Sequence, residues 1–313
     1  MSDAMIDEAV EAIGEIEIAV DTVPVETGMP PAMGWLPDWP DFRDYAAEAE
    51  EVLPELAKAN IADTVPSLPG AVDLRPWFSP IENQGSLGSC TAQAGVGIVE
   101  YFERRAFGTH LDASRLFLYK ATRNLLGWTG DTGAFLRTTM AALRAFGVPP
   151  EKYWPYVISR YEIEPSAFCY AFAQNYQAIV YYRLDPPGTM KNALLARIKT
   201  NLAAGLPSMF GFTVYSSISQ AASKGKIPLP IAGEKVVGGH AVVAAGYDDS
   251  LTIKNQPSGP QTTGALLIRN SWGSGWGSSG YGWLPYEYVL RGLAVDWWSL
   301  VKSSWLETGQ FGL

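Results

Sequence analysis

The chain has 313 residues, 47% of them hydrophobic and 18% charged, so it can bury a sizeable core and is not a disordered protein. No apolar run approaches the roughly eighteen residues that span a membrane, and no basic stripe interleaved with aromatic residues points to nucleic acid. We therefore expect a globular protein of one or two domains, without a membrane span and without a nucleic-acid partner.

The first 70 residues differ in charge from the rest. They contain 16 acidic and two basic residues, a net charge of −14, whereas the remaining 243 residues contain 16 acidic and 21 basic ones, a net charge of +5. These opposite signs favour a contact between an acidic leader (residues 1–70) and the body; a solvated tail is the alternative. Met1–Glu8 is acidic and no apolar h-region follows, so we expect a cytoplasmic protein, with non-classical export left open.

One part of the leader, residues 30–45, combines four prolines with large aromatic residues. Prolines favour an extended backbone, and such a segment needs a groove to lie in. It either covers a functional cleft or packs on the back of the core as an ordinary arm. Residues 46–60 predict only a short or broken helix, because Pro54 lies inside them. The linker-like residues 66–70 place a domain boundary near residue 70.

The next informative stretch runs from Gln84 to Ala92. Small residues separate Gln84 from Cys90, and a helical pattern begins at once, so a central helix is predicted over residues 90–107. A thiol at a helix N-terminus is biased toward thiolate, and the free N–H groups there can receive an oxyanion. A buried core cysteine is the plainer interpretation, and it is the one we expect for Cys169.

Later elements change from helices to strands. Helices are predicted over residues 114–124, 138–146 and 190–204, and strands over 177–184, 208–215, 236–247 and 264–270. Aromatic residues at helical spacing predict a C-terminal packing helix over 295–305. This order indicates an α+β protein in two lobes.

A nucleophilic thiol needs a base within hydrogen-bond reach. The sequence holds two histidines, of which His110 follows the exit of the central helix and is expected in an exposed loop. His240 lies in an apolar predicted strand after two glycines, where nothing local calls for a polar residue. Asn270 ends the following strand. The chain order Cys, His, Asn is therefore a candidate catalytic set.

From about residue 71 to 288 the sequence resembles the papain-like (C1 family) cysteine peptidases, and its leader is similar to that of some bacterial members. The motifs are Q-G-x-x-G-S-C at 84–90, H-A-V at 240–242 and N-S-W-G-x-x-W-G-x-x-G-Y at 270–281. The resemblance implies a two-lobe α+β fold, with a helical lobe, an antiparallel sheet or barrel lobe, and the active-site cleft between them. It implies a leader (1–70), a helical lobe (71–176) and a β-rich lobe (177–313) with a C-terminal helix.

The resemblance also implies roles. Cys90 is the nucleophile, with a lowered pKa, and His240 is its base. Asn270 orients the imidazole, and Gln84 forms the oxyanion hole with the Cys90 N–H. No metal ion or organic cofactor is needed.

Three further residues are expected on the substrate side of the site. Gly133 matches a family stretch that pairs with the substrate backbone, because glycine lets a peptide approach closely and add as a strand. Gly239 departs from the family pattern beside His240 and is expected to shape a substrate subsite. Trp272 is expected to shield the His240–Asn270 bond from water.

The implied activity is hydrolysis of peptide bonds in a peptide or protein substrate through a thioacyl intermediate, with the leader as an intramolecular inhibitor. Nothing indicates an obligate oligomer, so we expect a monomer. With Cys90 as nucleophile, only Cys169 remains and no intrachain disulfide can form, which favours a reducing compartment or a microbial member. An acyl or amide transferase on the same fold, which product analysis with added amines would identify, and an idle peptide-binding homologue are the alternatives.

Overall fold

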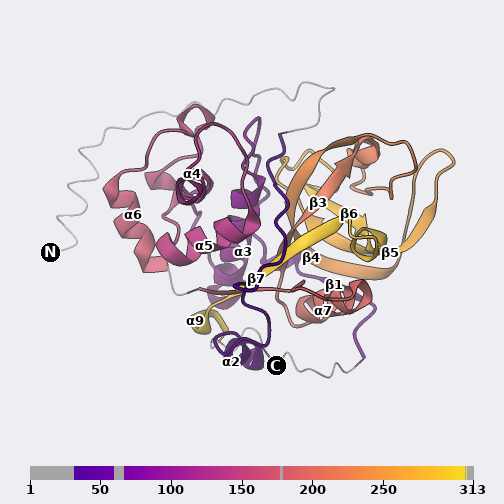
Figure 1. Ribbon diagram of the computed structural model, residues 1–313, viewed down its shortest axis with the longest axis horizontal. Helices are drawn as coiled ribbons and strands as arrows, with labels where there is room; N and C mark the ends of the chain where they lie inside the picture. The colour runs from indigo at the N-terminus through magenta and orange to yellow at the C-terminus, as the bar shows by residue number, and fades with distance from the viewer. Residues whose placement is uncertain (1–31, 60–66, 177–178, 307, 309–313) are drawn as a thin grey trace. The chain divides into compact units, whose positions relative to one another are not determined.

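The computed structural model describes residues 32–59, 67–176, 179–306 and 308. Its helices are α2 (Leu53–Lys58), α3 (Cys90–Phe107), α4 (Arg115–Leu126), α5 (Leu136–Phe146), α6 (Ala167–Ala173), α7 (Lys191–Ala203), α8 (Tyr286–Leu290) and α9 (Ser303–Leu306). Its strands are β1 (Ala71–Asp73), β2 (Val180–Arg183), β3 (Ser208–Tyr215), β4 (Val236–Lys254), β5 (Gln261–Arg269), β6 (Tyr281–Pro285) and β7 (Ala294–Val301). Figure 1 shows α3 to α6 on one side, β3 to β6 on the other, and the first described residues running between them.

The central helix α3 has the bounds that the sequence predicts, and it ends at Gly108 in the left-handed conformation (φ 75°). Its two internal glycines are explained by close packing. A Cβ at Gly95 would lie 3.2 Å from side chains of α4 and α5. A Cβ at Gly97 would lie 3.1 Å from Nε of Arg269 at the end of β5. The helix is therefore wedged between the other helices and the sheet.

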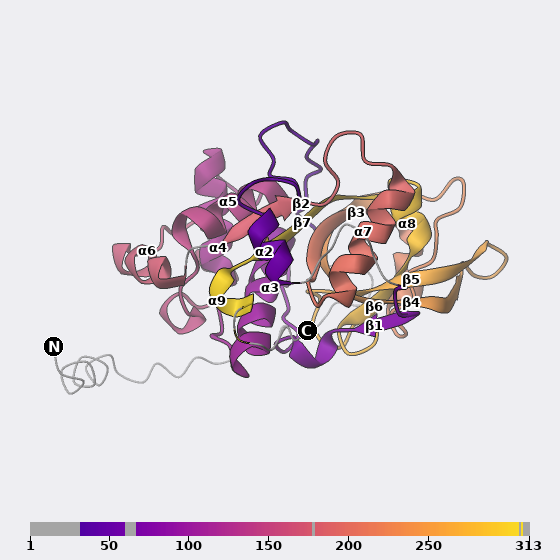
Figure 2. The same ribbon diagram turned by 90° about the horizontal axis from the view of Figure 1, so that it is seen from below.

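The sheet is antiparallel throughout, in the order β2-β7-β3-β4-β5-β6, with β1 pairing with β4. Helix α3 packs against β4, and α7 lies over β3 and β4, as Figures 1 and 2 show together. Strand β4 carries His240, and its pairing of Val243 with Arg269 brings the end of β5 alongside. The architecture is the α+β two-lobe fold that the sequence predicts.

The predicted C-terminal helix over residues 295–305 is wrong. Residues 294–301 form strand β7 between β2 and β3, and only the short α9 follows. Successive residues of a strand face opposite sides, and here both sides are covered, so Trp297 and Trp298 are both buried. Trp297 stacks on Phe210 with 3.8 Å between ring centroids. Because Trp297 and Trp298 are adjacent and both buried, the spacing of the aromatic residues in this stretch resembles the buried face of a helix.

Other element bounds shift by smaller amounts. The helix expected within 46–60 is reduced to α2, because Pro54 stands in its first turn. Strand β4 runs on to Lys254, beyond the predicted end at 247. The proposed boundary near residue 70 adjoins residues 60–66, which lie outside the described residues. Within the described ranges, no helix is long and apolar enough to cross a membrane.

Two phenylalanines of α3 offer a matched test of this core. Phe102 is fully buried and stacks on Trp305 at 5.3 Å, whereas Phe107 is 57% exposed. We expect Phe102→Ala to lower the free energy of unfolding by about 3–5 kcal/mol, because it leaves a cavity. Phe107→Ala should change it by less than about 0.5 kcal/mol. Denaturant unfolding measures both, and similar losses for the two variants would contradict this packing.

Candidate active site

Cys90 is the first residue of α3 and is fully buried. Its Sγ accepts a hydrogen bond from the backbone N–H of Ala241 on β4 at 3.4 Å. Asp131 holds the preceding loop, because its carboxylate accepts the N–H of Gly88 at 3.0 Å and the hydroxyl of Tyr119 at 2.6 Å. No motif in the sequence assigns this role to Asp131; its only signal there is a carboxylate inside a glycine-rich stretch.

The imidazole of His240 is held by Asn270. Nε2 of His240 lies 2.7 Å from Oδ1 of Asn270, and the N–H of Ser271 donates to the same oxygen at 2.8 Å. Because two groups converge on that oxygen, it is an acceptor, and Nε2 carries the imidazole proton. Nδ1 of His240, which has no hydrogen-bond partner among the described residues, is then free to accept a proton. Trp272 stacks on the imidazole with 4.5 Å between centroids.

Gln84 is fully buried beside this pair. Its Oε1 accepts the hydroxyl of Ser271 at 2.7 Å, which fixes the orientation of the amide. Its Nε2 donates to the carbonyl oxygens of Leu87 at 2.9 Å and Ala32 at 2.8 Å. Ser271 therefore orients both Gln84 and Asn270. Ser271 stands inside the N-S-W-G motif, but the sequence alone assigns it no role.

Residues 32–36, here called the covering segment, lie over these groups. The N–H of Trp35 donates to the carbonyl of Gly239 at 3.2 Å. On the other side, the N–H of Leu36 donates to the carbonyl of Ala134 at 3.1 Å, and the N–H of Ala134 donates to the carbonyl of Gly34 at 2.8 Å. Trp35 and Ala134 pair in the parallel sense. The covering segment is thus bound as an extra strand between the helical and β-rich lobes.

Glycines make this fit possible. A Cβ on Gly34 would lie 1.8 Å from the carbonyl oxygen of Gly88. Cβ atoms on Gly133 and Gly239 would lie 2.2 Å and 2.6 Å from carbonyl oxygens of the covering segment. Both predicted substrate-contacting glycines therefore contact the covering segment, and their role toward substrate stays a prediction. Trp272, expected to shield the His240–Asn270 bond, stacks on the His240 ring, and its role toward substrate stays a prediction as well.

Burial sets the charge state of the covered pair. It raises the pKa of the Cys90 thiol to about 11, against the opposing effect of hydrogen bonds from the backbone N–H groups of Ala241 and Gly34. Burial also lowers the pKa of His240 to about 4, although the bond to Asn270 acts the other way. Between these values both groups are neutral. The lowered thiol pKa that the resemblance implies does not hold while the covering segment is in place.

The other histidine and cysteine lie elsewhere. His110 follows α3 and lines a separate open pocket of about 460 Å³ with Phe107, Lys302 and Trp305. Cys169 is buried, as predicted, and accepts from the Ser166 hydroxyl at 3.4 Å. Among the described residues, no cluster of His, Cys, Asp and Glu side chains is arranged to hold a metal ion.

The Cys90 thiol lies at a helix N-terminus and accepts the N–H of the residue that follows His240, whose imidazole Asn270 orients. This is the arrangement of a thiol hydrolase. The sequence matches the papain family of cysteine proteases over residues 68–289, and the chain belongs to that family. It is a cysteine peptidase of the hydrolase class, and its substrate is a peptide or protein.

Individual proteins of known sequence or structure are similar to this chain. An uncharacterized peptidase C1-like protein of Acanthamoeba polyphaga mimivirus is 32% identical, covering 85% of each chain. Xylellain, a cysteine protease from Xylella fastidiosa, is a structural neighbour with a TM-score of 0.69 and 34% identity, over 87% of this chain and 96% of that one. Chymopapain of Carica papaya is 26% identical over 69% of this chain and 55% of its own length.

The covered pair predicts a pH profile for thiol alkylation. In the full-length chain, iodoacetamide should modify Cys90 slowly between about pH 5 and 8, because the thiolate is the reactive form and the thiol stays protonated. The rate should rise only as the pH approaches the raised pKa of Cys90, about 11. Intact mass with peptide mapping separates Cys90 from Cys169. Fast modification of Cys90 below pH 6 would contradict the neutral pair.

Proposed function

We propose that this protein is a cysteine endopeptidase that is latent at full length, because the covering segment occupies its substrate cleft. The observation that carries the proposal is the set of backbone hydrogen bonds from residues 34–36 to Ala134 and Gly239. A peptide added as a strand would use the same backbone groups. The carbonyl of Ala32 also occupies Nε2 of Gln84, the donor expected to stabilise an oxyanion.

The chemistry follows from the site once the covering segment moves out. Nδ1 of His240 takes the proton of the Cys90 thiol, and the thiolate attacks the carbonyl carbon of the scissile peptide bond. The N–H of Cys90 and Nε2 of Gln84 donate to the resulting oxyanion. The imidazolium, held by Asn270, protonates the leaving amine as the C–N bond breaks and a thioester forms. Water, activated by His240, hydrolyses the thioester and frees the thiol.

Ion pairs fasten the rest of the leader to the body. Arg137, at the start of α5, pairs with Asp44 at 2.7 Å and also with Asp38. Arg183 on β2 pairs with Asp44 at 3.4 Å and is almost fully buried. The charge asymmetry of the sequence thus has a local counterpart in pairs between leader carboxylates and body guanidinium groups.

The tight fit at Gly34 gives a direct test of latency. In the full-length chain, Gly34→Val should displace the covering segment, because its Cβ would lie 1.8 Å from the Gly88 carbonyl oxygen. We expect hydrolysis of a quenched fluorescent peptide library to rise by about tenfold or more, equivalent to about 1.4 kcal/mol of lost segment binding.

Gly70→Val is the matched control, since a Cβ there meets nothing within 4 Å. It should leave the rate at the wild-type level. Latency is refuted if Gly34→Val folds normally and hydrolyses the library no faster than Gly70→Val does.

The oxyanion role of Gln84 is testable in the Gly34→Val background. Gln84→Ala should lower kcat by about 10²–10³, because it removes one donor to the oxyanion. The alkylation rate of Cys90 should change much less, since that reaction forms no oxyanion. Gln174→Ala, at an exposed glutamine, serves as the control. Equal loss of alkylation and hydrolysis in Gln84→Ala would point to a disrupted site instead.

A further inference from the structure

One peptide unit in the loop before α3 is held at both ends. Its carbonyl belongs to Leu87 and accepts a hydrogen bond from Nε2 of Gln84 at 2.9 Å. Its N–H belongs to Gly88 and donates to both carboxylate oxygens of Asp131, at 3.0 and 3.1 Å. Oδ1 of Asp131 also accepts the hydroxyl of Tyr119 at 2.6 Å. A continuous line of hydrogen bonds therefore joins Asp131, which is exposed, to the buried amide of Gln84.

This line of hydrogen bonds ends on the donor that the oxyanion needs. Nε2 of Gln84 carries two protons, and the planar amide fixes the angle between them. One proton is directed at the Leu87 carbonyl, and the other at the carbonyl of Ala32 in the covering segment, 2.8 Å away. Because Oε1 of the same amide accepts the Ser271 hydroxyl at 2.7 Å, the amide is held against turning over. The bond to Leu87 therefore sets the direction in which the second proton points once the covering segment has left.

The charge of Asp131 strengthens the bond to Gln84. A carboxylate that accepts an N–H polarises the peptide unit, and the carbonyl at its other end becomes a better acceptor. The hydroxyl of Tyr119 accepts the N–H of Gly133 at 3.1 Å, so its own proton is directed at Asp131 and the polarity of the line is defined. The peptide unit itself is buried, which shields both of its hydrogen bonds from competing water.

We propose that Asp131 is a positioning residue of the oxyanion hole, and that it acts on Gln84 through the peptide unit between residues 87 and 88. The inference rests on the proposed function, because an oxyanion forms only when a peptide carbonyl is attacked. A plainer role would be support of the loop before Cys90. The two roles differ in one respect. An effect transmitted through Gln84 disappears when that side chain is absent, whereas loss of loop support impairs the enzyme with or without it.

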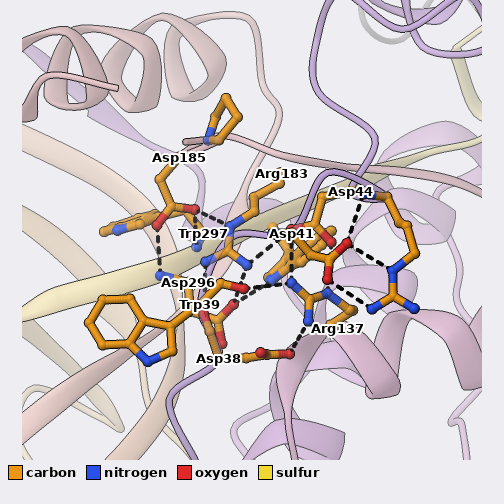
Figure 3. A network of polar contacts seen from close by, with 12 residues as sticks. Asp38, Trp39, Asp41, Asp44, Arg137, Arg183, Asp185, Asp296 and Trp297 are labelled. Atoms are coloured by element: carbon orange, nitrogen blue, oxygen red, sulfur yellow. Dashed lines mark hydrogen bonds and ion pairs between the residues drawn. The ribbon is translucent and has the colours of Figure 1, made fainter. Parts of the chain in front are cut away.

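A test of this role needs the cleft open with residues 84–89 undisturbed, and a second anchor of the covering segment provides the means. Nε1 of Trp35 donates to Oδ2 of Asp296 at 3.1 Å, and the indole is 5% exposed. Asp296 stands in a β-bulge, since β7 has one residue more than β3 between two successive pairs. Figure 3 shows Asp296 among the ion pairs of Arg183, which lies 3.3 Å from it. Trp35→Ala should therefore release the covering segment and leave residues 84–89 in place.

In the full-length Trp35→Ala chain, Asp131→Asn should lower kcat for one peptide of the library by about tenfold and leave KM unchanged. This loss is smaller than for removal of the donor itself, because the Gln84 amide stays. With Gln84→Ala added, Asp131→Asn should change kcat by less than about twofold. Asp248→Asn is the matched control, because that carboxylate also accepts a backbone N–H and a hydroxyl, both from Ser250, at 2.8 and 2.7 Å. An equal loss from Asp131→Asn with and without Gln84 would overturn the proposal.

A measurement without turnover separates this inference from the proposed function. In the full-length chain, exchange of the Gln84 side-chain amide protons with water, followed by NMR, should be about tenfold faster in Asp131→Asn than in Asp248→Asn. Tyr119→Phe, which withdraws the hydroxyl from the carboxylate, should also accelerate the exchange, and it replaces Asp131→Asn if that variant does not fold. Unchanged exchange would overturn the proposal. If no variant hydrolyses peptide but the exchange is faster, the proposed function fails and the positioning role of Asp131 stands.

Discussion

The packing of the first turn of α3 against β4 is the contact on which the site depends. It places the sulfur of Cys90 within 3.4 Å of the Ala241 N–H, one residue from the histidine. Further along α3, Gly97 packs closely on Arg269 at the end of β5, where a Cβ would lie 3.1 Å from Nε. Asn270 follows that arginine directly, so the contact between α3 and the end of β5 also positions the residue that holds the imidazole. Nucleophile, base and orienting amide are set by one interface between the lobes.

Local signals account for what the sequence predicted well. A glutamine, a run of small residues and a helix start are encoded within nine residues, so α3 and the place of Cys90 on it could be read directly. The bulge in β7 could not, because it is defined by register against β3 and not by its own residues. The only sign of Asp296 in the sequence is a carboxylate inside an apolar stretch. The prediction of a helix over 295–305 gave that carboxylate no role.

The sequence predicted that the acidic leader would contact the basic body, but not which residues form the contact. Its excess of acid indicated a contact with the basic body, and ion pairs to Arg137 and Arg183 are present. Which carboxylates take part depends on the path of the chain. Buried ion pairs add little net stability, because desolvation offsets attraction, but they penalise any register that leaves a charge unpaired. Their effect here is to fix the position along the chain that lies over Cys90.

The covering segment belongs to the same chain as the groups it covers, and this has a kinetic consequence. Its binding is unimolecular, so the fraction of molecules in which it is seated does not depend on protein concentration. Dilution, which separates a free inhibitor from its enzyme, leaves this contact unchanged. A competing peptide must instead reach the effective concentration of the tethered covering segment at its binding site. For short flexible connections this concentration is commonly in the millimolar range. Cutting the chain between the covering segment and the body would turn the same contacts into a bimolecular complex that dilution can dissociate.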